Sequence, residues 1–187
     1  MSDANTQQLN GLRVAILVAD GFEQVELTEP KRALDEAGAH TEIISPAKGN
    51  VQGWKHDEKA DTFPVDTPLE NAEEKNYDAL LLPGGVKNPD QLRTIQKAVN
   101  FVKAFFDAKK PVAAICHGPW TLAEAGVLKG RTVTSWPSLK TDLRNAGASW
   151  VDQEVVTDHG LVTSRKPDDI PAFNRKMIKA FSRGRHT

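Results

Sequence analysis

The chain contains very little cysteine: Cys116 is the only one among 187 residues. A single cysteine excludes an intrachain disulfide and any metal site built from several cysteines, and such usage is typical of a reducing compartment. Long hydrophobic runs are also missing, since no segment approaches the ~20 apolar residues of a membrane span. The first residues, MSDANTQQLNG, have neither the basic nor the apolar part of a secretory signal. We therefore expect a cytoplasmic protein with no membrane partner.

An excess of charge of either sign is missing too. The 24 Lys and Arg residues almost balance the 25 Asp and Glu residues, and the basic residues are scattered without interleaved aromatics, so no nucleic-acid partner is expected. The sequence has no phosphate-binding loop and no dinucleotide fingerprint. We expect no cofactor and no metal, because the remaining histidines lack the spacing of metal ligands: His40, His56, His159 and His186. Arg165 is expected to pair with a local carboxylate.

The residues that are present favour one globular domain over 1–187, with a polar tail at 1–10, because 39% of the chain is hydrophobic. Short apolar runs alternate with segments of helical periodicity, and this rhythm predicts an α/β fold with a mostly parallel sheet between helices on both faces. Residues 46–72, rich in Pro and Gly, are interpreted as a small surface excursion. The expected strands are 12–19, 40–45, 78–85, 111–115, 131–136 and a hairpin in 150–165; the expected helices are 23–38, 89–110, 119–126, 137–147 and 168–181.

The segment Ala-Ile-Cys-His-Gly, residues 114–118, has the layout of a nucleophile elbow, in which a strand ends, a sharp turn exposes one side chain and a helix begins. Small residues two positions either side, Ala114 and Gly118, allow a tight turn. The following helix would favour a thiolate and lower the pKa of Cys116. The alternative is that Cys116 only fills the core, as free cysteine often does.

The sequence resembles the ThiJ/PfpI superfamily, in its PfpI-like branch of intracellular peptidase-like and stress-response proteins. The resemblance rests on LRVAILVADGFEQVEL, YDALLLPGG, AICHGPWTLAEAGVLKGRTVTSWPSLKTDLRNAGASWVDQEVVTD and VTSRKPDDIPAF, which together span nearly the whole chain. It implies a flavodoxin-like doubly wound sandwich related to class I glutamine amidotransferases. It also implies a homodimer or a higher homo-oligomer.

By matching motifs, the resemblance makes Cys116 the nucleophile and Glu23, in DGFEQVEL, the acid that points at it. A carboxylic acid kept protonated by burial could donate a hydrogen bond to a thiolate. The amides of Gly85 and His117 would form an oxyanion hole, each donor being worth ~3 kcal/mol in a transition state. His117 is either the general base or only a backbone donor, because adjacent helical residues do not face each other.

Three further positions have both a functional and a structural interpretation. Gly84 could line the pocket or belong to a plain tight turn. Trp120 could line the pocket or belong to the core. Asp90 matches the acid that PfpI-like proteins contribute from the neighbouring subunit, but it stands where the family pattern has Glu, in a loop GGVKNPDQ that is one residue longer. Asp90 would also serve as an ordinary helix-start residue.

Three functions are compatible with such a site. The first is cofactor-free chemistry on a small carbonyl compound or a glycation adduct, of glyoxalase or deglycase type. The second is hydrolysis of peptide substrates by a cysteine peptidase. The third is a non-catalytic redox sensor in which Cys116 is oxidised.

Overall fold

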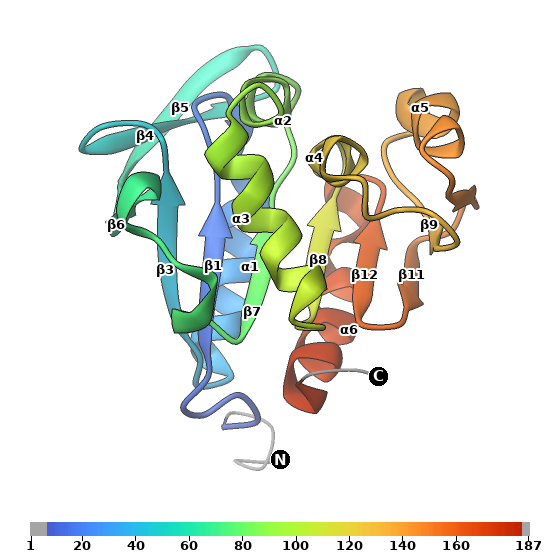
Figure 1. Ribbon diagram of the computed structural model, residues 1–187. Coiled ribbons are helices and arrows are strands. Elements are labelled where there is room, and N and C mark those ends of the chain that lie inside the picture. Colours follow the sequence, from blue (N-terminus) through green and yellow to red (C-terminus); the bar gives the residue numbers. More distant parts are fainter. Residues whose placement is uncertain (1–6, 185–187) are drawn as a thin grey trace.

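The fold is built on a seven-stranded sheet whose strand order is β11-β12-β8-β7-β1-β3-β6. The computed structural model describes residues 7–184. All neighbouring strands of this sheet run parallel except β11, which pairs antiparallel with β12 (Figure 1). The predicted α/β fold with a mostly parallel sheet is thereby confirmed. The strands are β1 (Arg13–Leu17), β3 (His40–Ser45), β6 (Thr67–Pro68), β7 (Ala79–Leu82), β8 (Val112–Ile115), β11 (Val155–Asp158) and β12 (Leu161–Ser164).

Helices cover both faces of the sheet. Contacts join α1 (Gln24–Glu36) to α6 (Ile170–Arg183) on one face, and α3 (Gln96–Asp107) to α4 (Pro119–Ala125) on the other. Two apolar clusters fill the space between sheet and helices, one for each face. Because both faces are covered, the central strands are continuous apolar runs, and residues 14–17 and 79–82 are buried throughout.

Two small sheets accompany the main one. The excursion after β3 forms a hairpin of β4 (Asn50–Lys55) and β5 (Glu58–Pro64), and β2 (Phe22–Glu23) adds a third strand beside β4. The hairpin lies at the end of the molecule where the parallel strands finish, so it overhangs the carboxyl edge of the main sheet (Figure 1). The second small sheet pairs β9 (Thr132–Val133) with β10 (Ser149–Trp150).

The structure corrects several predicted boundaries. The helix expected at 89–110 is two helices, α2 (Lys87–Leu92) and α3, because Ile95 is extended and the hydroxyl of Thr94 donates to the carbonyl of Gln91 at 2.7 Å. The strand expected at 131–136 shortens to β9 and lies outside the main sheet. The helix expected at 137–147 divides into a 3-10 turn, Pro137–Leu139, and α5 (Lys140–Asn145).

The polar tail expected at 1–10 lies partly outside the described residues, as does His186. The part that is described forms a turn in which Leu9 is fully buried and its amide donates to the carbonyl of Ala37 at 2.8 Å. Other 3-10 turns lie at Leu69–Asn71, Glu74–Asn76 and Pro167–Asp169. Within residues 7–184, no helix combines the length and the apolar character needed to cross a membrane.

Candidate active site

Cys116 lies directly after β8, at the carboxyl edge of the parallel sheet, which is where ligands bind in doubly wound folds. Its backbone is in the left-handed region, with φ of 62°, a conformation that costs energy for a residue other than glycine. Neighbours hold this turn in place. The amide of Cys116 donates to the carbonyl of Ser164 at 3.0 Å, and its carbonyl accepts from the amide of Trp136 at 2.9 Å. The predicted elbow is therefore present.

A buried carboxyl group, that of Glu26, lies against the Cys116 thiol. Glu26 stands in the first turn of α1 with no exposed surface, and its Oε1 accepts a hydrogen bond from the amide of Gly84 at 2.9 Å. Its other oxygen, Oε2, is buried and has no partner of ordinary hydrogen-bond geometry among the described residues, yet contact with the thiol is one of the causes that shift the pKa of both groups. Burial, and then the charge of Glu23, raise the pKa of Glu26 to about 8.

Glu26 therefore occupies the place beside the thiol that was expected for Glu23. The carboxylate of Glu23 lies elsewhere in the same cavity, where both of its oxygens accept from the amide of His56 at 3.2 and 3.3 Å. Its side chain is 15% exposed and lies 3.8 Å from Nδ1 of His56. The expected geometry of Glu23 is thus wrong by one turn of helix: the charge of Glu26 raises the pKa of the thiol, and the charge of Glu23 raises the pKa of Glu26.

The pKa of the Cys116 thiol is raised by burial and further by the negative charge of Glu26, which is opposite to the lowering that we expected. α4 has only seven residues, and its dipole does not offset the loss of hydration around the thiol of a residue that is 7% exposed. The amides of His117 and Gly85 act in the other direction, since they hydrogen-bond the sulfur. Cys116 and Glu26 are a coupled pair, because a proton held by Glu26 removes the charge that opposes a thiolate.

His117 contacts the thiol with its ring as well as its amide. Its Nδ1 lies 3.4 Å from Sγ of Cys116, because the left-handed backbone at Cys116 turns two adjacent side chains toward each other. The ring is buried. It stacks on the ring of Trp136, with 6.0 Å between ring centres, and meets the ring of Trp120 edge-on, with 5.8 Å between ring centres. Burial lowers the pKa of His117, so the imidazole is neutral near pH 7 and free to accept a proton.

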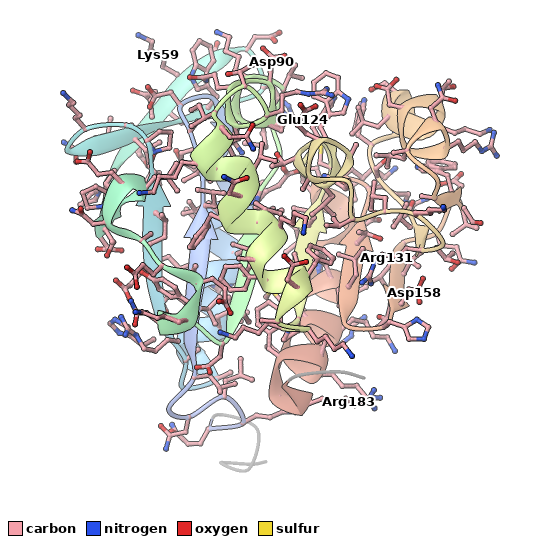
Figure 2. All side chains as sticks on the ribbon, in the orientation of Figure 1. Lys59, Asp90, Glu124, Arg131, Asp158 and Arg183 are labelled. Atoms are coloured by element: carbon pink, nitrogen blue, oxygen red, sulfur yellow. The ribbon has the colours of Figure 1, made fainter. Side chains whose placement is uncertain are left out.

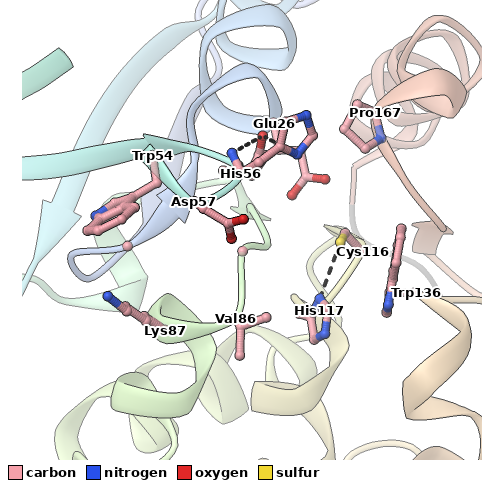
Figure 3. A pocket seen from close by; sticks show the side chains of 13 residues that line it. Glu26, Trp54, His56, Asp57, Val86, Lys87, Cys116, His117, Trp136 and Pro167 are labelled. Atoms are coloured by element: carbon pink, nitrogen blue, oxygen red, sulfur yellow. Dashed lines mark hydrogen bonds and ion pairs between the residues drawn. The ribbon is translucent and has the colours of Figure 1, made fainter. Parts of the chain in front are cut away.

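The thiol faces a cavity of about 610 Å³, within the usual range of small-molecule sites, roughly 300–1,000 Å³. One wall is the elbow; the opposite wall is the tip of the β4–β5 hairpin, with Trp54, His56 and Asp57 (Figure 3). The ammonium of Lys87 lies 4.1 Å from the centre of the Trp54 ring and ties this wall to the start of α2. None of these hairpin residues was predicted to belong to the site, although His56 lies in an exposed turn, with 79% of its side chain accessible.

Three predicted residues do not line this cavity. Gly84 is buried behind Gly85 and reaches the site only through its amide, which donates to Glu26. Trp120 packs behind His117, and its indole N–H donates to Asp142 at 2.9 Å, while Trp136 takes the expected place in the wall. Asp90 is exposed on α2, at the same end of the molecule as the hairpin (Figure 2). Arg165 pairs with carboxylates as expected, binding Asp169 at 2.9 Å and Asp152 at 2.8 Å.

The raised pKa of Glu26 predicts a pH-dependent stability. Between about pH 4.5 and about pH 8 the folded protein holds a proton on Glu26 that the unfolded chain releases. The contribution of protonated Glu26 to the free energy of unfolding is therefore fully present below pH 4.5 and is lost as the pH rises through 8. The loss is on the order of 4 kcal/mol for a fully buried group. Denaturant unfolding of the wild type and of Glu26→Gln at about pH 5, 6.5 and 8 measures it. The wild type should lose stability relative to the variant as pH rises, and parallel curves would contradict the raised pKa.

A parallel sheet flanked by helices, with a cysteine on a strained turn at its carboxyl edge and a buried acid against the sulfur, defines a flavodoxin-like protein with a nucleophile-elbow thiol. The DJ-1/PfpI family model matches residues 12–180. The chain belongs to the DJ-1/PfpI family.

Relatives of this family carry several names. The chain is 44% identical over 166 residues to the candidate cysteine protease YraA of Bacillus subtilis, covering 89% of this chain and 96% of the relative. It is 46% identical to general stress protein 18 of Bacillus subtilis, over 90% of this chain and 96% of that protein. It is also 46% identical to a protein of Pyrococcus abyssi named a deglycase, over 90% and 98%. The crystal structure of Drosophila melanogaster DJ-1beta matches with a TM-score of 0.82 at 27% identity, over 91% of this chain and 90% of that one.

Proposed function

We propose that this protein converts small reactive carbonyl compounds, or their early adducts with amines, by covalent chemistry at Cys116 without a cofactor. The observation that carries the proposal is the contact between the Cys116 thiol and the buried carboxyl of Glu26, whose pKa is raised to about 8. A group with this pKa gives and takes a proton readily near neutral pH. The name of the deglycase relative supports the same chemistry.

For a 2-oxoaldehyde the reaction balances without an external oxidant. The thiol–carboxyl pair first releases one of its two protons to water. The sulfur adds to the aldehyde carbon, an S–C bond forms, and the carbonyl oxygen receives the remaining proton, which leaves Glu26 ionised. Glu26, then ionised, takes the proton from the former aldehyde carbon and returns it to the neighbouring ketone carbon, while the hydroxyl proton on the first carbon's oxygen passes to the ketone oxygen. The first carbon is oxidised to a thioester and the second is reduced to an alcohol. Water then cleaves the S–C bond, releasing a 2-hydroxy acid and restoring the thiol.

The backbone amides suit this sequence of steps. The N–H groups of His117 and Gly85 hydrogen-bond the Cys116 sulfur, and donors so placed also reach an oxyanion on the carbon bonded to it. The volume of the cavity, about 610 Å³, accommodates an adduct carried on an amino-acid side chain as well as a free three-carbon compound. We further propose a role in the stress response within the cytoplasm, where a reactive thiol stays reduced; the name of the general stress protein supports this role.

Peptide hydrolysis is the second candidate, because the neutral ring of His117 lies 3.4 Å from the sulfur and one relative is named as a candidate cysteine protease. This function needs an acid that orients the imidazole. No carboxylate of residues 7–184 makes a hydrogen bond or an ion pair with the His117 ring. We propose that the protein forms a homodimer or a higher homo-oligomer, in which Asp90 of the partner subunit supplies this acid. The exposure of Asp90 on α2 supports it.

Turnover of methylglyoxal tests the proposal. The wild type should release lactate, detected directly, and Cys116→Ser should release none above the uncatalysed rate, because a hydroxyl without an adjacent strong base is a poor nucleophile. Thr94→Ala, which alters a hydroxyl on the loop between α2 and α3, is the matched control and should keep the wild-type rate.

A wild type that releases no more lactate than Cys116→Ser would overturn the carbonyl proposal. A peptidase would instead cleave peptides, lose that activity in His117→Ala and retain it better in Glu26→Gln. A redox sensor would turn over neither substrate class, while peroxide would oxidise Cys116 before other residues.

A further inference from the structure

The side chain of Asn88 is fully buried behind the double-glycine loop, and the chemistry described above does not use it. Its exposed fraction is zero, although an amide has four hydrogen-bonding positions to satisfy. Its Oδ1 accepts from the amide of Ala19, just after β1, at 2.7 Å. Its Nδ2 donates to the carbonyls of Pro83 and Gly84, just after β7, at 3.0 Å each. One carboxamide therefore joins the ends of two adjacent strands.

The two carbonyls that Asn88 holds belong to the two peptide units that face the active site. In a trans peptide the C=O and the N–H point in opposite directions, so fixing one fixes the other. The unit that begins with the Pro83 carbonyl ends in the Gly84 amide, which donates to Glu26 at 2.9 Å. The unit that begins with the Gly84 carbonyl ends in the Gly85 amide, which hydrogen-bonds the sulfur of Cys116. Asn88 holds both units from behind.

The loop would not keep this orientation by itself. Glycine residues stand on both sides of the second peptide unit, and Gly85 has φ of 77°, so the unit can rotate about its neighbouring bonds without a side chain to stop it. A rotated unit would present the carbonyl of Gly84 to the sulfur in place of the Gly85 amide. A carbonyl oxygen there repels a thiolate or an oxyanion, whereas the N–H stabilises both.

We propose that Asn88 is a positioning residue, whose carboxamide fixes the Gly84–Gly85 peptide so that the Gly85 amide faces the Cys116 sulfur. The orientation of the amide group is itself determined, because the Ala19 N–H requires an acceptor and the two carbonyls require donors. This inference rests on the proposed function only in that the same amide would serve the reaction; its effect on the thiol exists without any substrate.

The test is the pH dependence of alkylation of Cys116 by iodoacetamide, which reports the thiolate directly since the chain has no other cysteine. Asn88→Leu removes both donors without adding charge, and Asn88→Asp removes them while keeping the acceptor for Ala19. Both variants should alkylate at least tenfold more slowly than the wild type at about pH 7.5, with profiles displaced to higher pH. If Asn88→Leu does not fold, Asn88→Ser, which is also neutral, takes its place.

The matched control is Asp66→Ala, which removes another hydrogen bond to the main chain, from the Ile43 amide at 2.8 Å, away from the loop. It should lose stability but keep the wild-type alkylation profile. A neutral Asn88 variant that is folded and alkylates like the wild type would overturn the inference, as would a displaced profile in Asn88→Asp alone, which would be an effect of charge. A wild type without carbonyl turnover would refute the proposed function and leave this test unaffected.

Discussion

Glu26→Gln should lower carbonyl turnover at least ~100-fold, because the proton that moves between thiol and substrate then has no carboxyl group to hold it. Glutamine has nearly the same shape and can still accept the hydrogen bond that the Gly84 amide donates. The substitution therefore removes the titration of Glu26 and little else. Steady-state rates of lactate formation from methylglyoxal measure the effect, with folding checked by circular dichroism.

Glu23→Gln is the matched control, since it makes the same chemical change three residues away and in the same cavity. The Glu23 carboxylate accepts from the His56 amide and raises the pKa of Glu26 through its charge, so its loss should lower the pKa of Glu26 and change turnover less than ~10-fold. A Glu23→Gln variant that loses as much activity as Glu26→Gln, or more, would return the acid–base role to Glu23.

Gly85→Ala should be among the most destabilising single substitutions in the chain. A Cβ on Gly85 would lie 2.5 Å from the carbonyl oxygen of Gly21 and 2.7 Å from the amide nitrogen of Glu23, and both are backbone atoms that cannot swing away. Left-handed strain adds about 1–2 kcal/mol and overpacking a further 1–3 kcal/mol. The free energy of unfolding from denaturant titration measures the sum, and alkylation of Cys116 should slow in the same variant because the Gly85 amide shifts.

Gly130→Ala separates the two causes. Gly130 has φ of 79°, close to the 77° of Gly85, but a Cβ there would meet nothing within 4 Å. Gly130→Ala should lower the free energy of unfolding only by the cost of left-handed strain, about 1–2 kcal/mol. If Gly85→Ala and Gly130→Ala lower the free energy of unfolding equally, a Cβ at Gly85 is not crowded by the segment 21–23.

The fold followed from the sequence because its central strands are covered on both faces. Continuous apolar runs such as 12–19 have no other stable place than the middle of a sandwich, and the strand 40–45 was predicted to the residue. The break between α2 and α3 was missed because Leu92 and Ile95 keep a helical spacing across it. A hydroxyl at Thr94 that bonds back to the main chain is a local effect that periodicity does not register.

The elbow cysteine was equally predictable, whereas its acid was assigned one turn of helix too early. Glu26, Leu27, Pro30 and Leu34 are the buried positions of α1, so an acid stands within the apolar stripe of that helix. Helical spacing from Pro30 and Leu34 points to Glu26, whereas Glu23 precedes the helix and belongs to β2. The hairpin wall was beyond reach, because the position of Trp54 and His56 opposite the thiol depends on how a second sheet is attached.

Because the second sheet is attached at the edge of the main sheet, the reacting groups and the facing wall of the cavity come from different segments of the chain. The groups of the proposed chemistry come from the loops and helix starts at the edge of the main sheet, whereas the facing wall comes from a hairpin tip that lies about sixty residues before the elbow. Lys87, at the start of α2, is one of the side chains that join the two parts, since its ammonium lies over the ring of Trp54. Changes in the sequence or length of the hairpin can therefore alter which molecules are admitted while the reacting pair stays the same. If the proposed reaction is correct, substitutions in this single segment should change substrate preference without changing the reaction.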